Sequence, residues 1–255
     1  MFGLANPTKF MKFSSILLPF LTIITVGLFV VGSYMIFHAP EENLQGPLGR
    51  ILYIHAPAAY IAMGTFVFIA LANFTGYIWR HPLADMAAKN AALIGATFTL
   101  LTLLTGMLWG KPAWGTWWVW DARLTSLLIL FIIYLAYMSI WQIIEDQVKA
   151  ARLATIVAAL GLVMVPIIKF SVDWWNTLHQ PASLLKAGGP SIHPSMLIIL
   201  LIMFAAFTFL FITLLFVNIR TEITRRRARA IEMRILQQNI QHTNISTNNA
   251  LDNGA

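Results

Sequence analysis

The sequence contains no cysteine and few charged residues. The absence of Cys from all 255 residues excludes disulfides, Cys-ligated zinc or iron–sulfur sites and thioether attachment of a prosthetic group through C-x-x-C-H. Charged residues make up 11% of the chain and hydrophobic residues 58%, against about 25% and about 45–50% in soluble domains. This composition excludes an ordinary soluble or disordered chain and indicates an integral membrane protein.

Several catalytic and nucleotide-binding motifs are also missing. The sequence has no phosphate-cradling glycine loop, no H-E-x-x-H and no G-x-S-x-G, and its Gly188-Gly189-Pro190 is typical of a turn. No apolar segment has a charged residue at its centre, which argues against an ion pump or an ion-coupled transporter. The net charge of +7 comes from basic residues beside apolar segments, as membrane topology produces, and we expect no nucleic-acid partner and no enzymatic activity.

Six apolar segments are long enough to cross a membrane, because a helix needs about 20 residues to span about 30 Å of hydrocarbon. They lie at Ser15–Phe37, Leu52–Trp79, Ala91–Trp109, Leu124–Ile144, Leu153–Phe170 and Ser195–Val217. The first is too long for the apolar region of a signal peptide, and no small-residue cleavage site follows it. The sequence therefore predicts an all-α, polytopic membrane protein with six transmembrane helices.

The distribution of basic residues predicts that both termini face the cytoplasm. With the N-terminus inside, 12 of the 17 Lys and Arg lie on the cytoplasmic side and 5 lie on the opposite side. Residues 1–220 form the predicted membrane domain. Residues 221–255 form a cytoplasmic basic helix and a tail, in which ITRRRARAIEMRILQQNI continues the sixth helix and HTNISTNNALDNGA is disordered.

The three predicted outer loops, at 38–51, 110–123 and 171–194, carry most of the tryptophans and histidines. Seven of the nine Trp and four of the six His lie on this side. An interfacial aromatic belt alone places Trp at both faces, so the asymmetry indicates that the outer face is the functional one. Two of the four outer histidines, His38 and His179, are interpreted as structural.

The stretch WGTWWVWD at 114–121 is the most unusual of the outer segments. On an α-helix, four of its residues share one face at i, i+3, i+4 and i+7: Trp114, Trp117, Trp118 and Asp121. Trp120 lies to the side, and Gly115 permits close approach of a flat ligand. We predict a short amphipathic helix at the interface, forming an aromatic shelf edged by one carboxylate. A strand with period 2 and a simple aromatic anchor at the lipid headgroups stay open.

Two histidines stand at the outer ends of predicted helices, each near a proline. His55 and His193 therefore suit two axial ligands of a haem iron, since imidazole is its usual protein ligand; an interfacial His bonded to a carbonyl or water is the alternative. Arg50 and Arg123 are outer cations suited to haem carboxylates. For Arg123, pairing with Asp121 or capping the fourth helix is equally compatible with the sequence.

The segment WGKPAWGTWWVWDARLTS resembles the WG-x-x-W-x-WD signature of the WWD haem-handling proteins of cytochrome c biogenesis. The number of spans, the length, the tryptophan loop between spans 3 and 4 and the histidines before spans 2 and 6 are similar to the C component of the cytochrome c maturation system. That family is called haem exporter protein C. Other WWD families, the F component and the system II synthases, are generally longer.

The resemblance implies that haem b is held at the outer face of the bacterial or mitochondrial inner membrane and presented to a haem chaperone, the E component. It carries over His55 and His193 as axial ligands and residues 114–121 as haem platform and chaperone contact. It implies as partners a one-helix D component, the ATP-binding-cassette and permease subunits A and B, and membrane lipid. The alternatives are a permease subunit that translocates haem or another substrate, and a structural assembly subunit whose aromatic loop docks a protein.

Overall fold

The computed structural model describes residues 6–39, 46–175, 177–179, 189 and 192–252, and over these residues the chain is helical, without strands. Its elements are α1 (Pro7–His38), η2 (Pro47–Ile51, a 3-10 helix), α2 (Leu52–Trp79), α3 (Pro82–Trp114), α4 (Ala122–Ile143), α5 (Gln147–Trp174) and α6 (Pro194–Asp252). Each α-helix contains a stretch long and apolar enough to cross a membrane. The predicted fold class and the six spans are confirmed.

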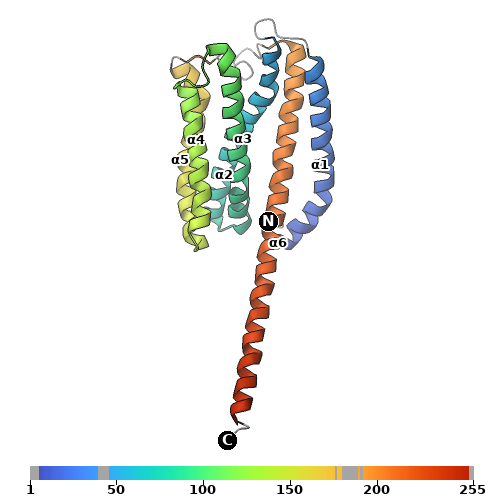
Figure 1. Cartoon of the computed structure of the whole chain (residues 1–255), viewed down its shortest axis with the longest axis vertical. Helices are drawn as coiled ribbons and strands as arrows, with labels where there is room; N and C mark the ends of the chain where they lie inside the picture. The colour runs from blue at the N-terminus through green and yellow to red at the C-terminus, as the bar shows by residue number, and fades with distance from the viewer. Residues whose placement is uncertain (1–5, 40–45, 176, 180–188, 190–191, 253–255) are drawn as a thin grey trace.

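The helices form a bundle with one peripheral helix (Figure 1). Helices α2, α3, α4 and α5 pack in sequence-adjacent pairs, α6 lies against α2 and α3, and α1 packs on α6 at the edge. We call the end that holds residues 39, 46–51, 115–121, 175, 177–179 and 192–193 the outer end. The opposite end, with residues 80–81, 144–146 and the start of α1, is the inner end. These names follow the orientation predicted from the sequence.

Helix α6 extends far beyond the other helices at the inner end (Figure 1). The basic segment therefore continues the sixth helix, as the sequence predicts. The helix also runs to Asp252, through most of the polar stretch for which the sequence predicts disorder. No proline or glycine interrupts residues 221–252, so nothing in the local chemistry ends the helical hydrogen bonding there.

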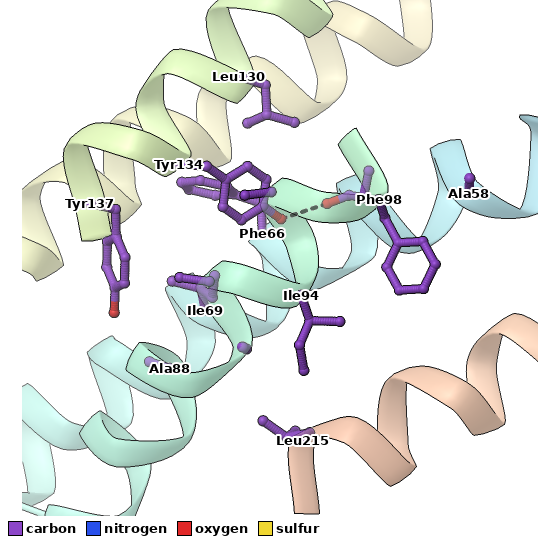
Figure 2. Packing of buried hydrophobic residues seen from close by; sticks show 14 of the residues in the cluster. Ala58, Phe66, Ile69, Ala88, Ile94, Phe98, Leu130, Tyr134, Tyr137 and Leu215 are labelled. Carbon is purple, nitrogen blue, oxygen red and sulfur yellow. Dashed lines mark hydrogen bonds between the residues drawn. The ribbon is translucent and has the colours of Figure 1, made fainter. Parts of the chain in front are cut away.

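Aromatic and aliphatic side chains pack together inside the bundle (Figure 2). The rings of Phe66 and Tyr134 meet edge to face with centroids 4.7 Å apart, and the Tyr134 hydroxyl donates to the Ala62 carbonyl at 2.7 Å. Gly95 gives Tyr134 its space, because a Cβ there would overlap the ring. Helix α4 is thereby held against both α2 and α3.

Polar contacts tie further pairs of helices together inside the apolar domain. Asn73 on α2 donates to the Tyr137 hydroxyl on α4 at 2.8 Å. The hydroxyls of Thr25 on α1 and Thr213 on α6 are 3.1 Å apart, although 188 residues separate them in the chain. Such hydrogen bonds stabilise helix pairs in membranes, where lipid offers polar groups no alternative partner.

Candidate functional site

The tryptophan stretch lies between two capped helix ends. Helix α3 ends at Trp114, and Gly115 follows in the left-handed conformation (φ +77°), where its N–H donates to the Lys111 carbonyl at 3.0 Å. Asp121 caps the start of α4. Residues 115–121 are neither helix nor strand, which corrects the prediction of a separate amphipathic helix. The physical reason is the glycine, which ends α3 as a left-handed C-terminal residue.

This geometry divides the four tryptophans of the stretch into two pairs. Trp114 and Trp118 are half-buried, and Trp118 packs against the hydrophobic core. The buried indole N–H of Trp118 has no hydrogen-bond partner within the described residues. Trp117 and Trp120 are 51% and 77% exposed. One pair can therefore face a ligand inside the outer end, while the other is available to a second molecule.

Asp121 connects the second outer loop to the third. Its Oδ1 accepts from the Leu124 N–H at 2.8 Å, which caps α4. Its Oδ2 accepts from the Thr177 hydroxyl at 2.6 Å and lies 2.5 Å from Nδ1 of His179. Only 8% of the Asp121 side chain and 14% of the His179 side chain are exposed. A single carboxylate therefore positions His179, for which the sequence alone predicts only a structural role.

The electrostatics of this pair fix the proton positions. Burial raises the pKa of Asp121, but hydrogen bonds from Thr177 and from the Leu124 N–H, together with nearby His179, outweigh it and hold the pKa below its usual value. Burial lowers the pKa of His179 more than Asp121 raises it. The imidazole is therefore neutral at pH 7, and its Nδ1–H donates to the carboxylate. Nε2 keeps the lone pair that a metal ligand needs.

His179 also packs against the tryptophan stretch. Its ring meets Trp114 edge to face, with centroids 4.9 Å apart and an interplanar angle of 71°. Trp114 in turn meets Trp109 edge to face at 5.1 Å. The aromatic packing and the Asp121 hydrogen bond together hold the imidazole in one orientation.

His55 is oriented in a similar way on α2. Its Nδ1 lies 2.9 Å from the hydroxyl of Thr105, and its ring packs on Gly106 of α3. The Thr105 hydroxyl donates to the Leu101 carbonyl at 2.7 Å, so it accepts from the Nδ1–H of His55. This network assigns the free lone pair of His55 to Nε2. His55, His179 and Arg123 are close enough to interact electrostatically.

The other predicted ligand, His193, has a different setting. It is exposed just before α6, with Nδ1 2.8 Å from the Ser195 hydroxyl and 3.4 Å from the Ser195 N–H, which donates to it. This arrangement places the ring proton on Nε2. Its described hydrogen bonds are local, and none reaches the group formed by His55, Trp114, Asp121, Arg123 and His179, which we call the outer cluster.

The two predicted arginines differ in their surroundings. Arg50 on η2 donates to the Ala39 carbonyl at 3.3 Å, while its buried Nε has no partner among the described residues. Arg123 is half-buried near Asp121, Tyr60 and Asp173. Within the described part of the chain its guanidinium forms no ion pair, and Asp121 rather than Arg123 caps α4.

A further cation near Arg123 was not identified from the sequence. Lys169 of α5 donates to the Tyr60 hydroxyl at 3.4 Å, and its ammonium lies 5.7 Å from the centre of that ring. Cations inside a membrane domain are costly and mark binding sites more often than structural positions. The outer end thus combines two imidazoles whose Nε2 atoms make no hydrogen bond to a described residue, indole surfaces, and the cations Arg50, Arg123 and Lys169. This set of groups fits a flat iron complex that carries carboxylates.

The sequence of the chain is similar to those of several known proteins. The family model described as "Heme exporter protein C" (CcmC) matches residues 1–234. "Heme exporter protein C" of Bradyrhizobium diazoefficiens is 51% identical over 230 residues, covering 90% of this chain and 88% of the relative. The protein of the same name from Escherichia coli K12 is 42% identical over 194 residues, covering 76% and 78%. A "cytochrome c biosynthesis ccmC-like mitochondrial protein" of Marchantia polymorpha is 46% identical over 175 residues, covering 69% and 74%.

Proposed function

Because the chain belongs to the heme exporter protein C family, we propose that it binds haem b at the outer end of a multi-pass inner-membrane domain. It then presents the haem to a membrane-anchored chaperone during c-type cytochrome biogenesis. The observation that carries this proposal is the pair His55 and His179. Each has its Nδ1–H engaged and makes no hydrogen bond through Nε2 to any described residue, and the two lie within electrostatic reach of one another. The outer end corresponds to the periplasmic or intermembrane side.

The axial ligands in this proposal are His55 and a histidine of the third outer loop. The sequence predicts His193 for the second position, and that assignment stays a prediction. The geometry supports His179 more strongly, since a carboxylate orients its Nδ1–H in the manner usual for metal-bound imidazoles. Two imidazoles on opposite faces fill the iron's coordination sphere and suppress reaction with oxygen while the haem is held.

The remaining residues of the outer end take supporting roles. Trp114 and Trp118 form the wall against which the porphyrin lies, with Gly115 permitting close approach. Exposed Trp117 and Trp120 contact the chaperone. Three cations pair with the haem carboxylates: Arg50, Arg123 and Lys169. Asp121 holds the site together without touching the iron.

We further propose that the chain works within a multi-subunit exporter containing a one-helix subunit and an ATP-binding-cassette pair. The rival permease function requires polar positions along the spans that a substrate can use. The amide nitrogen of the buried Asn73 instead donates to the Ile69 carbonyl at 2.9 Å and to the Tyr137 hydroxyl at 2.8 Å, while its Oδ1 has no partner among the described residues. This internal pairing favours presentation over translocation. Haem transport into sealed vesicles by this chain alone would reverse that preference.

The absorption spectrum of the purified protein tests the proposal directly. The wild type is expected to retain haem with the spectrum of six-coordinate, bis-imidazole iron. His55→Ala and His179→Ala are expected to abolish that spectrum, whereas His38→Ala, an outer histidine bonded to the Tyr34 carbonyl, serves as the matched control. If the bis-imidazole spectrum is lost in His193→Ala and retained in His179→Ala, the ligand pair is His55 and His193, as the sequence predicts. Absence of haem from the wild type would overturn the proposal.

A further inference from the structure

A cavity of about 750 Å³ lies at the inner end, opposite the outer cluster. It opens between the end of α2, the start of α3, the end of α4 and the start of α5, and Arg226 of α6 reaches it. Five charged side chains line it: Arg80, Asp85, Lys89, Arg152 and Arg226. Four of the five are cations, so the lining carries a formal charge of +3. This net positive charge of the lining favours binding of an anionic ligand.

Arg80 adopts a backbone conformation that disfavours its own side chain. It has φ 49° and ψ 45° at the end of α2, and among the described residues it is the non-glycine with positive φ. A glycine would adopt this conformation without the penalty of roughly 1 kcal/mol that a Cβ incurs. The exposed guanidinium makes no hydrogen bond or ion pair within the described part of the chain. The strain and the free guanidinium together indicate a role for this side chain.

The opposite wall of the cavity retains positive charge after its internal pairing. Lys89 lies 3.8 Å from Glu222, and Arg226 donates to the same carboxylate at 2.8 Å. Arg225 is also 3.1 Å from Glu222, so one carboxylate faces three cations. An additional anion can therefore bind here without displacing the existing ion pairs.

Trp141 forms part of the wall of the same cavity. The residue is 9% exposed, and the Lys89 ammonium lies 5.6 Å from the centre of its ring. The indole N–H lies near the Tyr137 hydroxyl without meeting hydrogen-bond geometry, and it is unpartnered among the described residues.

The mouth of the cavity is apolar. Tyr77 and Ile78 line it and are 63% and 62% exposed on a helix that crosses the membrane. A ligand with hydrocarbon chains can therefore lay them on this surface while its charged group enters the cavity. Topology alone explains an excess of cations on one side of a membrane protein. It does not explain their convergence on a cavity, or an arginine in a left-handed position.

We propose that this cavity binds the phosphate of an anionic phospholipid from the inner leaflet. Arg80 and Arg152 hold the phosphate at the rim, Lys89 supports it from the opposite wall, and the chains lie on Tyr77 and Ile78. Basic pockets between transmembrane helices on the cytoplasmic side are known to bind the headgroups of anionic lipids. The bound lipid would fix the α2–α3 turn, which contains Arg80, relative to the start of α5.

Native mass spectrometry of the full-length protein tests this site. The protein is titrated with phosphatidylglycerol, with phosphatidylcholine and with soluble glycerophosphate. We expect saturable binding of one phosphatidylglycerol, and affinity about tenfold lower in Arg80→Gly and in Arg152→Gln, because each loses a charge-assisted hydrogen bond. Arg234→Gln removes an exposed cation of α6 that does not line the cavity, and is expected to bind like the wild type.

The Arg80→Gly variant separates lipid binding from folding. Glycine suits the left-handed position, so thermal stability in lipid-free detergent is expected to stay level or rise while the lipid is lost. Unchanged phosphatidylglycerol binding in both variants would overturn the proposal. Equal binding of phosphatidylcholine would show that headgroup charge is irrelevant, and equal binding of glycerophosphate would show a site for free phosphate. The haem spectrum is expected to be the same in Arg80→Gly, so this outcome is independent of the haem proposal.

Discussion

Asp121 has two structural roles at the outer end. It caps α4 through one oxygen and holds Thr177 and His179 through the other. We expect Asp121→Asn to keep the cap, since Asn caps helices as well as Asp, but to lose the charge-assisted bond to His179. Haem affinity is expected to fall about 10–100-fold, as for other carboxylates behind metal-bound imidazoles, with little change in thermal stability.

Asp121→Ala provides the matched comparison. It removes the cap as well, so it is expected to lower the free energy of unfolding by about 1 kcal/mol in addition to weakening haem binding. Haem titration and thermal unfolding of both variants separate the two roles. Full haem affinity in Asp121→Asn would show that the carboxylate does not act through His179.

His179 gives the stability of the outer end a defined pH dependence. Burial lowers its pKa in the folded protein, so the unfolded chain takes up the proton first as pH falls below about 6.5. The wild type is therefore expected to lose stability between pH 7.5 and 5.5 relative to His179→Gln, which cannot titrate. Thermal unfolding of haem-free protein at the two pH values measures the difference. A wild type that gains stability on acidification would show that the pKa is raised instead.

At the level of residues, the sequence identified most of the outer cluster but not its connections. His55, Trp114, Asp121 and Arg123 stand out because their types are unusual beside apolar segments. His179 did not, because its significance lies in a contact with Asp121, 58 residues away in the chain. The neighbouring proline favours His193 as a haem ligand in the sequence. A proline near a helix start constrains the backbone, however, and does not determine what the histidine side chain contacts. The signal that was available is the placement of NTLHQ directly after a second tryptophan pair.

At the scale of helices, substitution by alanine is expected to have opposite effects on stability at Gly95 and at Gly64. A Cβ at Gly95 of α3 would overlap the Tyr134 ring, whereas a Cβ at Gly64 of α2 meets nothing within 4 Å. We expect Gly95→Ala to lower the free energy of unfolding by about 1–3 kcal/mol through overpacking. Gly64→Ala is expected to be neutral or to stabilise by up to about 1 kcal/mol, through helix propensity. Thermal unfolding in detergent compares them, and equal effects would contradict the packing of α4 on α3.

The helices themselves were largely predictable, and their ends less so. Apolar length alone gave all six spans, and the bounds of α2 match the prediction. The other helices begin earlier than predicted, because capped, mixed-polarity turns extend beyond the apolar segments, as at Asn6 of α1 and Asp146 of α5, while α4 ends one residue before the predicted Ile144. The helical spacing of the tryptophan stretch predicts a helix that the structure lacks, because Gly115 adopts the left-handed conformation and ends α3.

At the scale of the whole molecule, the cysteine-free sequence makes orientation directly measurable. A single introduced cysteine would be the only thiol of the protein and therefore its only site of labelling. Three exposed positions suit this test: Ala113 at the outer end, Gln147 at the inner end and Glu232 on the α6 extension. A membrane-impermeant maleimide added outside intact cells is expected to label Ala113→Cys alone. Gln147→Cys and Glu232→Cys are expected to react after the membrane is opened. The reverse pattern would place the outer cluster in the cytoplasm.

The contact between Thr25 and Thr213 has a consequence for how the protein is made. Ribosomes add about 5–20 residues per second, so the 188 residues between these hydroxyls separate the synthesis of the two partners by roughly 10–40 s. During that interval α1 lies in the bilayer without its packing partner, and the Thr25 hydroxyl is satisfied by the Leu21 carbonyl of its own helix. Helices α2 to α5 can associate meanwhile. The last span to leave the ribosome is thus the one that draws the first span into the finished bundle.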